Sequence, residues 1–313
     1  MGQAVIGVDL GGTNLRTALV SPAGDILAKQ KEASLASEGH QKVIARLLKN
    51  ITQQREKAKE LGLDVTAVGV GAPGVILSGD GIVVTSPNFP DWNNLPLRQE
   101  LEKALSLPVF IENDANTAAL GEQWRGAARD VGSMIFLTLG TGVGGGIVYE
   151  GRIWGGAHGM AGEVGHMTLV PDGRKCGCGN KGCLEMYASS RGIVMSYLDA
   201  VPPGAADGAS SITSADIYRA ASEGEPLAVR VMQDMGRYLG IGIANLINIL
   251  NPAMVVIGGG VRDAWRLFIE ATRQEVRQRA FSYPAERTQI VPSVLGDDAG
   301  MVGAAAVALQ KRR

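Results

Sequence analysis

The stretch Asp9-Leu10-Gly11-Gly12-Thr13-Asn14 decides the fold, because it is a glycine turn between two short apolar segments. Residues 4–8 and 15–20 have the length and composition of strands, so a β-hairpin is predicted here. Glycines let the backbone approach a phosphate and point its N–H groups at the oxygens. Thr13 and Asn14 add side-chain donors, and Asp9 can hold Mg²⁺ directly or through water. The turn is therefore a candidate phosphate site.

The same pattern returns later in the chain. Residues 134–139 predict a strand, 140–146 a glycine turn with the same chemistry, and 147–150 a second strand. A tight hairpin would explain either turn alone, but two hairpins of one design indicate a duplicated α/β fold. Apolar spacing adds further helices and strands. We expect helices at 41–61, 113–124, 227–250 and 299–309, strands at 65–70, 109–112 and 254–257, and a turn at Gly258-Gly259-Gly260.

Composition excludes several classes of protein. The chain has 313 residues, 45% hydrophobic and 19% charged, with a net charge of −1, which is ordinary for a globular protein. Nothing in this charge favours binding to nucleic acid or to a membrane surface. No apolar run reaches the roughly 20 residues that span a bilayer, and no signal peptide is evident. We expect a cytoplasmic protein, with a flexible stretch at residues 202–211, which are rich in Pro, Gly, Ala and Ser.

Two other nucleotide-binding motifs fit poorly. Gly140, Gly142 and Gly145 have the spacing G-x-G-x-x-G, but a dinucleotide fingerprint needs a helix directly afterwards. The chain instead continues with a predicted strand. A P-loop needs a Gly-Lys pair, and the sequence contains none.

All three cysteines lie in one run, at Cys176, Cys178 and Cys183, and His166 stands ten residues before the first. Three thiolates and one imidazole match a tetrahedral structural zinc site, which would have no open position for substrate. The alternatives are three free thiols or a disulfide.

Carboxylates form two further candidate groups. In Glu112-Asn113-Asp114, a predicted strand meets a predicted helix, where an acid is often only a helix cap. Glu163 and Glu185 flank the zinc cluster, which would hold both in a fixed frame. Such groups suit a ligand with many hydroxyls, although both glutamates could instead be surface residues.

Together these motifs resemble the ROK family of bacterial sugar kinases and repressors. The resemblance rests on Asp9-x-Gly-Gly-Thr, the Gly140 turn, Glu163-Val164-Gly165-His166 and the cysteine run through Glu185, and it covers essentially the whole chain. It implies a duplicated ribonuclease H-like fold of the hexokinase and actin type, with two α/β domains around a cleft. We expect a small domain at residues 1–118 plus 297–313 and a large domain at 119–296.

The resemblance, closest to the glucokinase members, also implies roles for residues. Asp114 would be the general base for the sugar 6-hydroxyl, and His166 would bind sugar while its other ring edge holds zinc. The implied sugar-binding residues are Gly74, Asn88, Asn113, Asp114, Glu163, His166 and Glu185. The implied zinc ligands are His166, Cys176, Cys178 and Cys183. The implied ATP-binding residues are Asp9, Gly11, Gly12, Thr13, Asn14, Gly140, Thr141, Gly142, Gly258, Gly259 and Gly260.

The expected function is therefore ATP-dependent, Mg²⁺-assisted phosphorylation of a hexose, with glucose as the expected substrate. Family repressors carry a DNA-binding segment before the first turn, whereas only eight residues precede Asp9 here, which favours an enzyme. An actin-like ATPase of another kind would not need the acid cluster beside the zinc site. Other hexoses (N-acetylglucosamine, N-acetylmannosamine, mannose, allose or fructose), polyphosphate as donor, and a dimer or tetramer as the homo-oligomer stay open.

Overall fold

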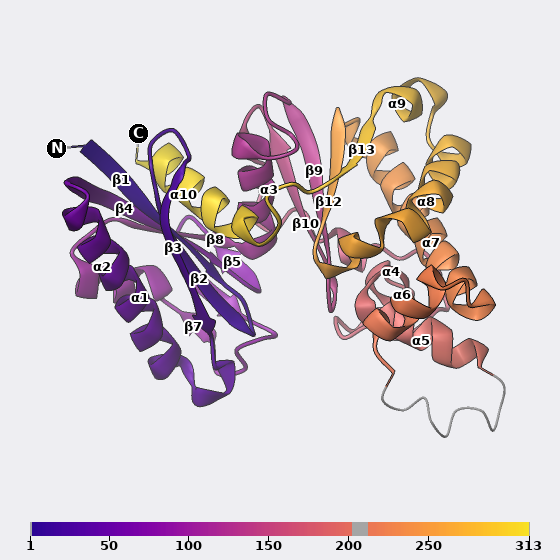
Figure 1. The fold of residues 1–313 in the computed structure, drawn as a ribbon, viewed down its shortest axis with the longest axis horizontal. Helices are drawn as coiled ribbons and strands as arrows, with labels where there is room; N and C mark the ends of the chain where they lie inside the picture. Colours follow the sequence, from indigo (N-terminus) through magenta and orange to yellow (C-terminus); the bar gives the residue numbers. More distant parts are fainter. Residues whose placement is uncertain (1, 202–211, 313) are drawn as a thin grey trace. The chain divides into compact units, whose positions relative to one another are not determined.

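The computed structural model describes residues 2–201 and 212–312, so the stretch at 202–211 that we expected to be flexible lies outside the described residues (Figure 1). The chain divides into two compact units. The first contains Met1–Phe136, Gly146–Gly162 and Val294–Arg313, and the second contains Leu137–Gly145 and Glu163–Ser293. The domain boundaries at residues 118 and 296 stay a prediction.

The first unit is built on a five-stranded sheet with the order β3-β2-β1-β4-β8. β2 runs antiparallel to β1 and β3, whereas β4 is parallel to both β1 and β8. A small antiparallel sheet, β5-β6-β7, follows β4 in the chain. The strands are β1 (Gly2–Leu10), β2 (Asn14–Val20), β3 (Ile26–Ala33), β4 (Leu63–Ala72), β5 (Val75–Leu77), β6 (Ile82–Thr85), β7 (Asn93–Leu95) and β8 (Val109–Asn113).

A second five-stranded sheet has the order β11-β10-β9-β12-β13. When the strands of each sheet are counted in chain order, both sheets have the order 3-2-1-4-5. The predicted duplication is therefore confirmed. Its strands are β9 (Ser133–Leu139), β10 (Val143–Tyr149), β11 (Arg152–Ile153), β12 (Met254–Gly258) and β13 (Gln289–Pro292). The boundary between the two units passes within β9 and within β10.

Helices complete each unit. The first unit has α1 (His40–Glu60), α2 (Leu97–Leu105), α3 (Asp114–Arg125) and α10 (Ala299–Lys311), with short 3₁₀ turns η1 (Ala36–Glu38) and η5 (Gly296–Asp298). The second has α4 (Glu185–Ala188), α5 (Ser190–Ala200), α6 (Ser214–Ser222), α7 (Pro226–Leu250), α8 (Trp265–Arg279) and α9 (Ser282–Arg287), with η2 (Val164–His166) and η4 (Gly260–Ala264). In the described part of the chain, no helix has the length and apolar character to cross a bilayer.

One predicted boundary is wrong. We expected the second glycine turn to run to Gly146, but β10 already begins at Val143. Gly146 is a strand residue packed on α3, where an added Cβ would lie 2.8 Å from the carbonyl oxygen of Ala115. Close packing, and not a turn, explains this glycine.

Alternation along β1 places its two faces in different cores. Ile6 and Val8 belong to the larger core, which also contains residues of α1 and α2. Val5 points to the other face and packs with Met301 and Ala305 of α10. Figure 1 shows α10, in yellow, crossing this sheet. The sheet of the first unit is therefore covered by helices on both faces.

Contact between α10 and its neighbours is backbone to backbone. Gly7 and Gly69 are paired in register, and a Cβ on either would lie 1.9 Å from a carbonyl oxygen of α10, that of Met301 or that of Ala304. On the other side, a Cβ on Gly303 would lie 1.6 Å from the carbonyl oxygen of Thr117 in α3. Glycine on both partners therefore lets the sheet, α10 and α3 pack at distances that no side chain would permit.

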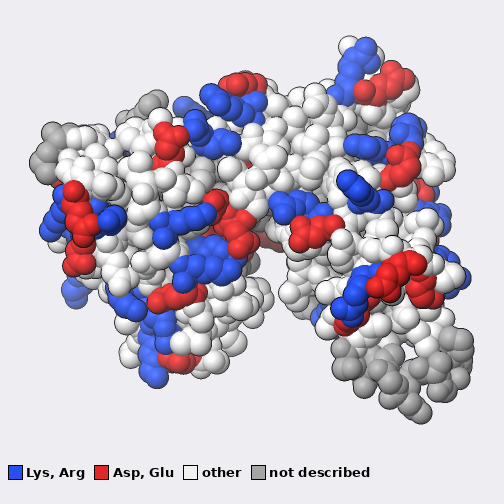
Figure 2. All heavy atoms as spheres, viewed as in Figure 1, with Lys and Arg blue, Asp and Glu red and all other residues white. Residues whose placement is uncertain are grey.

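Charged side chains of both signs lie among the uncharged ones on the surface. On the face shown in Figure 2, Lys and Arg are interspersed with Asp and Glu. Two ion pairs tie β3 to η5, directly before α10: Lys29 lies 2.8 Å from Asp298, and Lys31 lies 3.5 Å from Asp297. Exposed pairs of this kind contribute little stability individually.

We predict that Gly303→Ala destabilises the protein by about 1–3 kcal/mol, because the added methyl must push α10 away from α3. The helix propensity of alanine offsets up to about 1 kcal/mol of this cost. Urea unfolding would measure the change. Gly79→Ala is the matched control, since a Cβ there meets nothing within 4 Å. An unchanged or raised midpoint for the Gly303 variant would contradict this account of the packing.

Candidate active site and zinc centre

The first glycine turn is held from both sides. The Gly11 N–H donates to the carbonyl oxygen of Asn14 at 2.8 Å, which closes the hairpin. Ser34 then ties the turn to the end of β3, since its hydroxyl donates to the carbonyl oxygen of Gly12 at 2.7 Å. A Cβ on Gly12 would lie 2.5 Å from Nδ2 of Asn88. The predicted sugar residue Asn88 thus packs directly on the predicted phosphate turn.

Asp9 lies at the end of β1, opposite Arg16 in the hairpin register. Arg16 Nη1 lies 3.2 Å from the carboxylate of Asp9, and Arg16 Nη2 lies 2.9 Å from the carboxylate of Asp297. Burial raises the pKa of Asp9 above its ordinary value, and the charge and hydrogen bond of Arg16 act in the opposite direction. Arg16 is a site residue that sequence reasoning missed, although the hairpin register alone could have placed it opposite Asp9.

The junction of β8 and α3 presents Asp114. The helix cap is Asn113, whose side-chain oxygen accepts from the N–H groups of Ala115 at 2.9 Å and Asn116 at 3.2 Å. Asp114 is the first helical residue, and its carboxylate accepts from the N–H of Ala115 at 2.9 Å. Asn113 is therefore the cap, and Asp114 adds a carboxylate at the first turn of the helix.

Gly74 lies beside this junction. Its carbonyl oxygen accepts from Nδ2 of Asn113 at 3.2 Å. Its φ of 111° lies in the region that favours glycine, and a Cβ would lie 2.2 Å from the carbonyl oxygen of Thr85. Gly74, Asn113 and Asp114, three of the residues that the resemblance assigned to sugar binding, therefore lie close together.

The loop that carries Asn88 is anchored at its base. Phe89 and Trp92 are fully buried and stacked, with ring centroids 4.5 Å apart. Asp91 accepts from the backbone N–H of His40 at 2.6 Å, which ties the loop to the first residue of α1. These contacts give Asn88 a rigid support.

The second glycine turn belongs to the second unit. It closes through the Gly140 N–H, which donates to the carbonyl oxygen of Gly142 at 2.9 Å. The turn Gly258-Gly259-Gly260 is its neighbour, because a Cβ on Gly259 would lie 2.3 Å from the carbonyl oxygen of Leu139. The structure therefore brings two of the three predicted nucleotide segments together within one unit.

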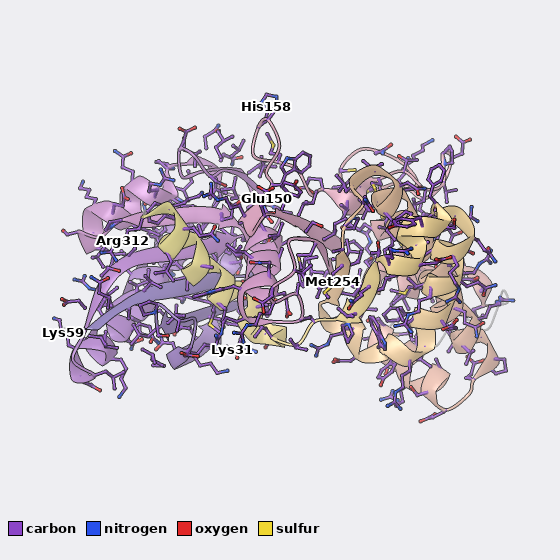
Figure 3. All side chains as sticks on the ribbon, turned by 90° about the horizontal axis from the view of Figure 1, so that it is seen from above. Lys31, Lys59, Glu150, His158, Met254 and Arg312 are labelled. Carbon is purple, nitrogen blue, oxygen red and sulfur yellow. The ribbon has the colours of Figure 1, made fainter. Side chains whose placement is uncertain are left out.

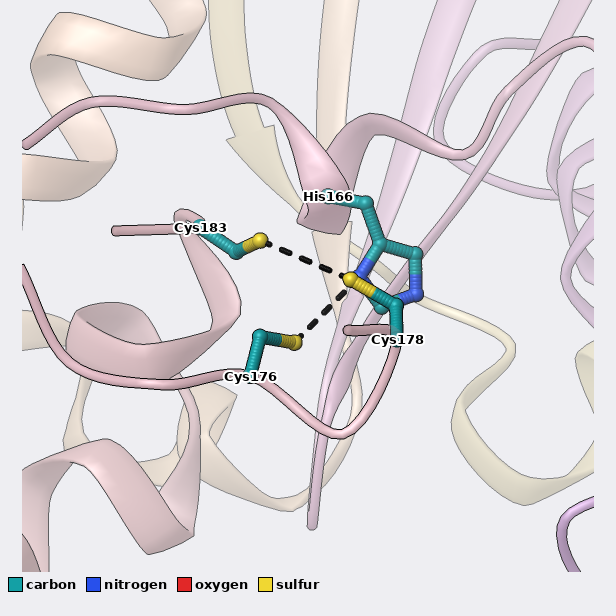
Figure 4. Close-up of side chains that lie close together, drawn as sticks. All are labelled: His166, Cys176, Cys178 and Cys183. Carbon is teal, nitrogen blue, oxygen red and sulfur yellow. Dashed lines mark hydrogen bonds between the residues drawn. The ribbon is translucent and has the colours of Figure 1, made fainter. Parts of the chain in front are cut away.

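The predicted zinc ligands converge (Figure 4). Ligand atoms of His166, Cys176, Cys178 and Cys183 all lie within 4.8 Å of one another. A tetrahedral zinc ion places two sulfurs about 3.8 Å apart, and a sulfur and a nitrogen about 3.6 Å apart. The sulfurs of Cys178 and Cys183 are 3.8 Å apart, and Cys176 Sγ is 3.6 Å from His166 Nδ1. The four residues therefore fit a structural zinc ion.

The electrostatics of the cysteines differ from one to the next. Burial raises the pKa of the Cys183 thiol to about 12 and also raises the pKa of Cys176. A hydrogen bond from the backbone N–H of Asn180 lowers the pKa of Cys178. A cation at this site would favour the thiolate form of all three.

The two flanking glutamates have different positions. Glu163 Oε2 lies 4.0 Å from His166 Nε2, the ring nitrogen that does not face the cysteines. One oxygen of Glu185 accepts from the N–H of Val143 at 3.1 Å, and the other lies 3.6 Å from Cys176 Sγ. Glu185 thus links the zinc cluster to the second glycine turn, a contact that the sequence did not reveal.

Comparisons with known proteins agree with these motifs. The model of the ROK family matches residues 5–311. A glucokinase of Halalkalibacterium halodurans is 37% identical, over 95% of this chain and 92% of the relative. A ROK family glucokinase from Streptomyces griseus, solved in complex with glucose and AMPPNP, is 36% identical, with a TM-score of 0.82 over 98% of this chain and 99% of that one. A xylose repressor of Caldicellulosiruptor bescii is 34% identical over 98% of this chain and 78% of the repressor.

We predict one tightly bound zinc ion per chain, and we predict that Cys178→Ala loses it. Removing one of four ligands weakens the site and releases His166 and Glu185 from their common frame. Elemental analysis of freshly purified protein would measure the metal. Lys181→Ala, in the same loop, is the control and should keep its zinc. Wild-type protein without zinc, or a Cys178 variant that retains it, would contradict the assignment.

Proposed function

This chain belongs to the ROK family, and we propose that it is a glucokinase, which transfers the γ-phosphoryl group of ATP to the 6-hydroxyl of glucose. The observation that carries the proposal is the β8–α3 junction, where Asn113 caps the helix and Asp114 places a carboxylate at its first turn, beside Gly74 and Asn113. The glucokinase relatives, matched over nearly the whole chain, support the same activity.

We propose that Asp114 orients the 6-hydroxyl and accepts its proton as the oxygen bonds to the γ-phosphorus and the bond from that phosphorus to ADP breaks. Of Asn113's two amide hydrogens, one bonds to Gly74, which leaves the other for a sugar hydroxyl. Gly74, Asn88, Glu163, His166 and Glu185 are proposed to bind the remaining hydroxyls. Hydroxyls held by such groups fix the reacting oxygen in place.

Backbone N–H groups of the glycine turns are proposed to bind the phosphates of ATP, and Gly258-Gly259-Gly260 to lie along the adenosine. Asp9 carries the right chemistry for Mg²⁺, and since Arg16 already contacts its carboxylate, we propose a contact through water. Bound Mg²⁺ would neutralise charge on the β- and γ-phosphates. His166 and the three cysteines are proposed to hold zinc in a structural role.

The xylose repressors among the relatives favour one alternative, a sugar sensor without catalysis. A kinase for another hexose, or one that uses polyphosphate, is the other. Formation of the sugar phosphate from ATP and from polyphosphate, measured with glucose, N-acetylglucosamine, N-acetylmannosamine, mannose, allose and fructose, separates them. A sensor consumes no ATP with any of the six sugars.

We further propose a cytoplasmic homo-oligomer, either a dimer or a tetramer. The cytoplasm supplies ATP and keeps clustered thiols reduced. Three large apolar side chains are at least 70% exposed: Ile249 near the end of α7, and Phe281 and Tyr283 at the start of α9. Such exposure supports association of chains.

We predict that Asp114→Asn lowers kcat by about 10²–10⁴-fold with little change in glucose affinity, because the amide keeps the shape but cannot accept a proton. Steady-state kinetics and equilibrium glucose binding would measure both effects. Asp64→Asn, an exposed acid on β4, is the control and should match wild type. A variant that kept more than a tenth of wild-type kcat would show that Asp114 is not the base.

We predict that kcat/KM for glucose exceeds that for N-acetylglucosamine by at least about 10²-fold. Asn88 sits on a loop anchored by Phe89 and Trp92, so the space beside the sugar cannot easily widen for an acetamido group. Parallel kinetics with the two sugars provide the test. Equal or reversed values would refute this role of the loop and leave the kinase activity intact.

A further inference from the structure

Glu112 is a buried carboxylate close in sequence to the proposed base, Asp114. The proposed chemistry gives Glu112 no role. Glu112 stands two residues before Asp114, in β8, and is only 5% exposed. Burying a carboxylate is costly unless hydrogen bonds and charge compensate it. Its partners therefore indicate what the residue does.

One oxygen of Glu112 holds the start of α3 at two points. Oε1 accepts from the backbone N–H of Asn113 at 3.1 Å and from Nδ2 of Asn116 at 3.1 Å. Asn113 and Asn116 flank Asp114 on both sides in the chain. The first turn of α3 is thus fixed by the Asn113 cap and by the Glu112 carboxylate.

The other oxygen faces a cation from the far end of the sequence. Lys311 Nζ, at the end of α10, lies 3.6 Å from Glu112 Oε2. At this distance the ammonium and the carboxylate form an ion pair but no hydrogen bond. The end of α10 therefore compensates the buried charge that holds the turn carrying Asp114.

Glu112 also borders a large cavity of the first unit. The cavity has a volume of about 990 Å³, and its walls include Trp124, Glu150, Val307 and Lys311. Figure 3 labels Glu150, in the turn between β10 and β11, and Arg312, which follows α10. Small solutes can therefore reach the site of the Glu112 side chain from this cavity.

We infer that Glu112 is a positioning residue for Asp114, and that the Glu112–Lys311 pair sets the orientation of the base at the start of α3. The inference rests on the proposed kinase function, because it assigns Asp114 as the base. A misplacement of about 1 Å at a reacting group can cost about 10²-fold in rate. Glu112 therefore acts mainly on kcat, because its bond to Asn113 is to the backbone and leaves the amide side chain of Asn113 held by Gly74.

The first test is Glu112→Ala. We expect kcat per folded enzyme to fall about 10²-fold while the KM for hexose changes less than about threefold, since contacts to the sugar remain. Circular dichroism measures the folded fraction at the assay temperature. Glu150→Ala, an acid on the same cavity with no hydrogen bond to α3 in the described structure, is the matched control and should keep wild-type kcat.

Recovery of kcat by added acetate is a second measurement. It distinguishes positioning of Asp114 from a purely structural role of Glu112. Glu112→Ala removes a group the size of acetate beside an open cavity, so added acetate should raise kcat of this variant several-fold. It should not raise the kcat of wild type, of Glu150→Ala or of Asp114→Asn. Acetamide, which lacks the charge that pairs with Lys311, should restore less.

Should Glu112→Ala fail to fold, Glu112→Gln decides the matter. Its amide oxygen can accept in place of Oε1, but its NH₂ group faces the Lys311 ammonium. We expect about a tenfold loss of kcat, recovered when Lys311→Met is added. Equal kcat for wild type and the folded Glu112 variants overturns the inference alone, whereas wild type without hexose-dependent ATP consumption overturns the proposed function.

Discussion

The first unit depends on one constraint: at three glycines, α10 must contact the sheet and α3 backbone to backbone. Gly7, Gly69 and Gly303 make this possible. The same helix reaches the candidate site twice, because a Cβ on Gly300 would lie 2.7 Å from Cγ of Asp9, and Lys311 pairs with Glu112. The positions of the first glycine turn and of the proposed base therefore both depend on where one Ala- and Gly-rich helix packs.

Sequence patterns identified several elements whose burial follows a clear period, although α2 and α8, which also bury residues at helical spacing, were missed. The first hairpin, α1, α7 and the duplicated hairpin design all appeared in the expected places. The small sheet escaped prediction because β5, β6 and β7 are three or four residues long and each buries only one large apolar side chain. The false turn before Gly146 has a different origin, since a glycine required by packing looks the same in sequence as a glycine required by a turn.

Local spacing predicted that His166 and the three cysteines would converge, because they lie within one short segment of the chain. Local spacing could not predict contacts between segments that are distant in the sequence. Arg16 pairs with Asp297, Glu185 reaches Val143, and Lys311 reaches Glu112, each across a long stretch of sequence. These partners follow from how the elements pack, which no single motif encodes. The motifs thus named most candidate residues, while the structure supplied the groups that hold them in place.

The position of α10 in the chain has a consequence for biosynthesis. The five strands of the first sheet are complete by residue 113, yet the helix that covers Val5, Ala18 and Ala67 ends at residue 311. At bacterial and eukaryotic elongation rates, about 10–40 s separate these two points. During that time the face with Val5, Ala18 and Ala67 lacks α10, and transiently exposed apolar surface of this kind promotes aggregation. The first unit can therefore reach its native packing only after the last helix of the chain has been synthesised.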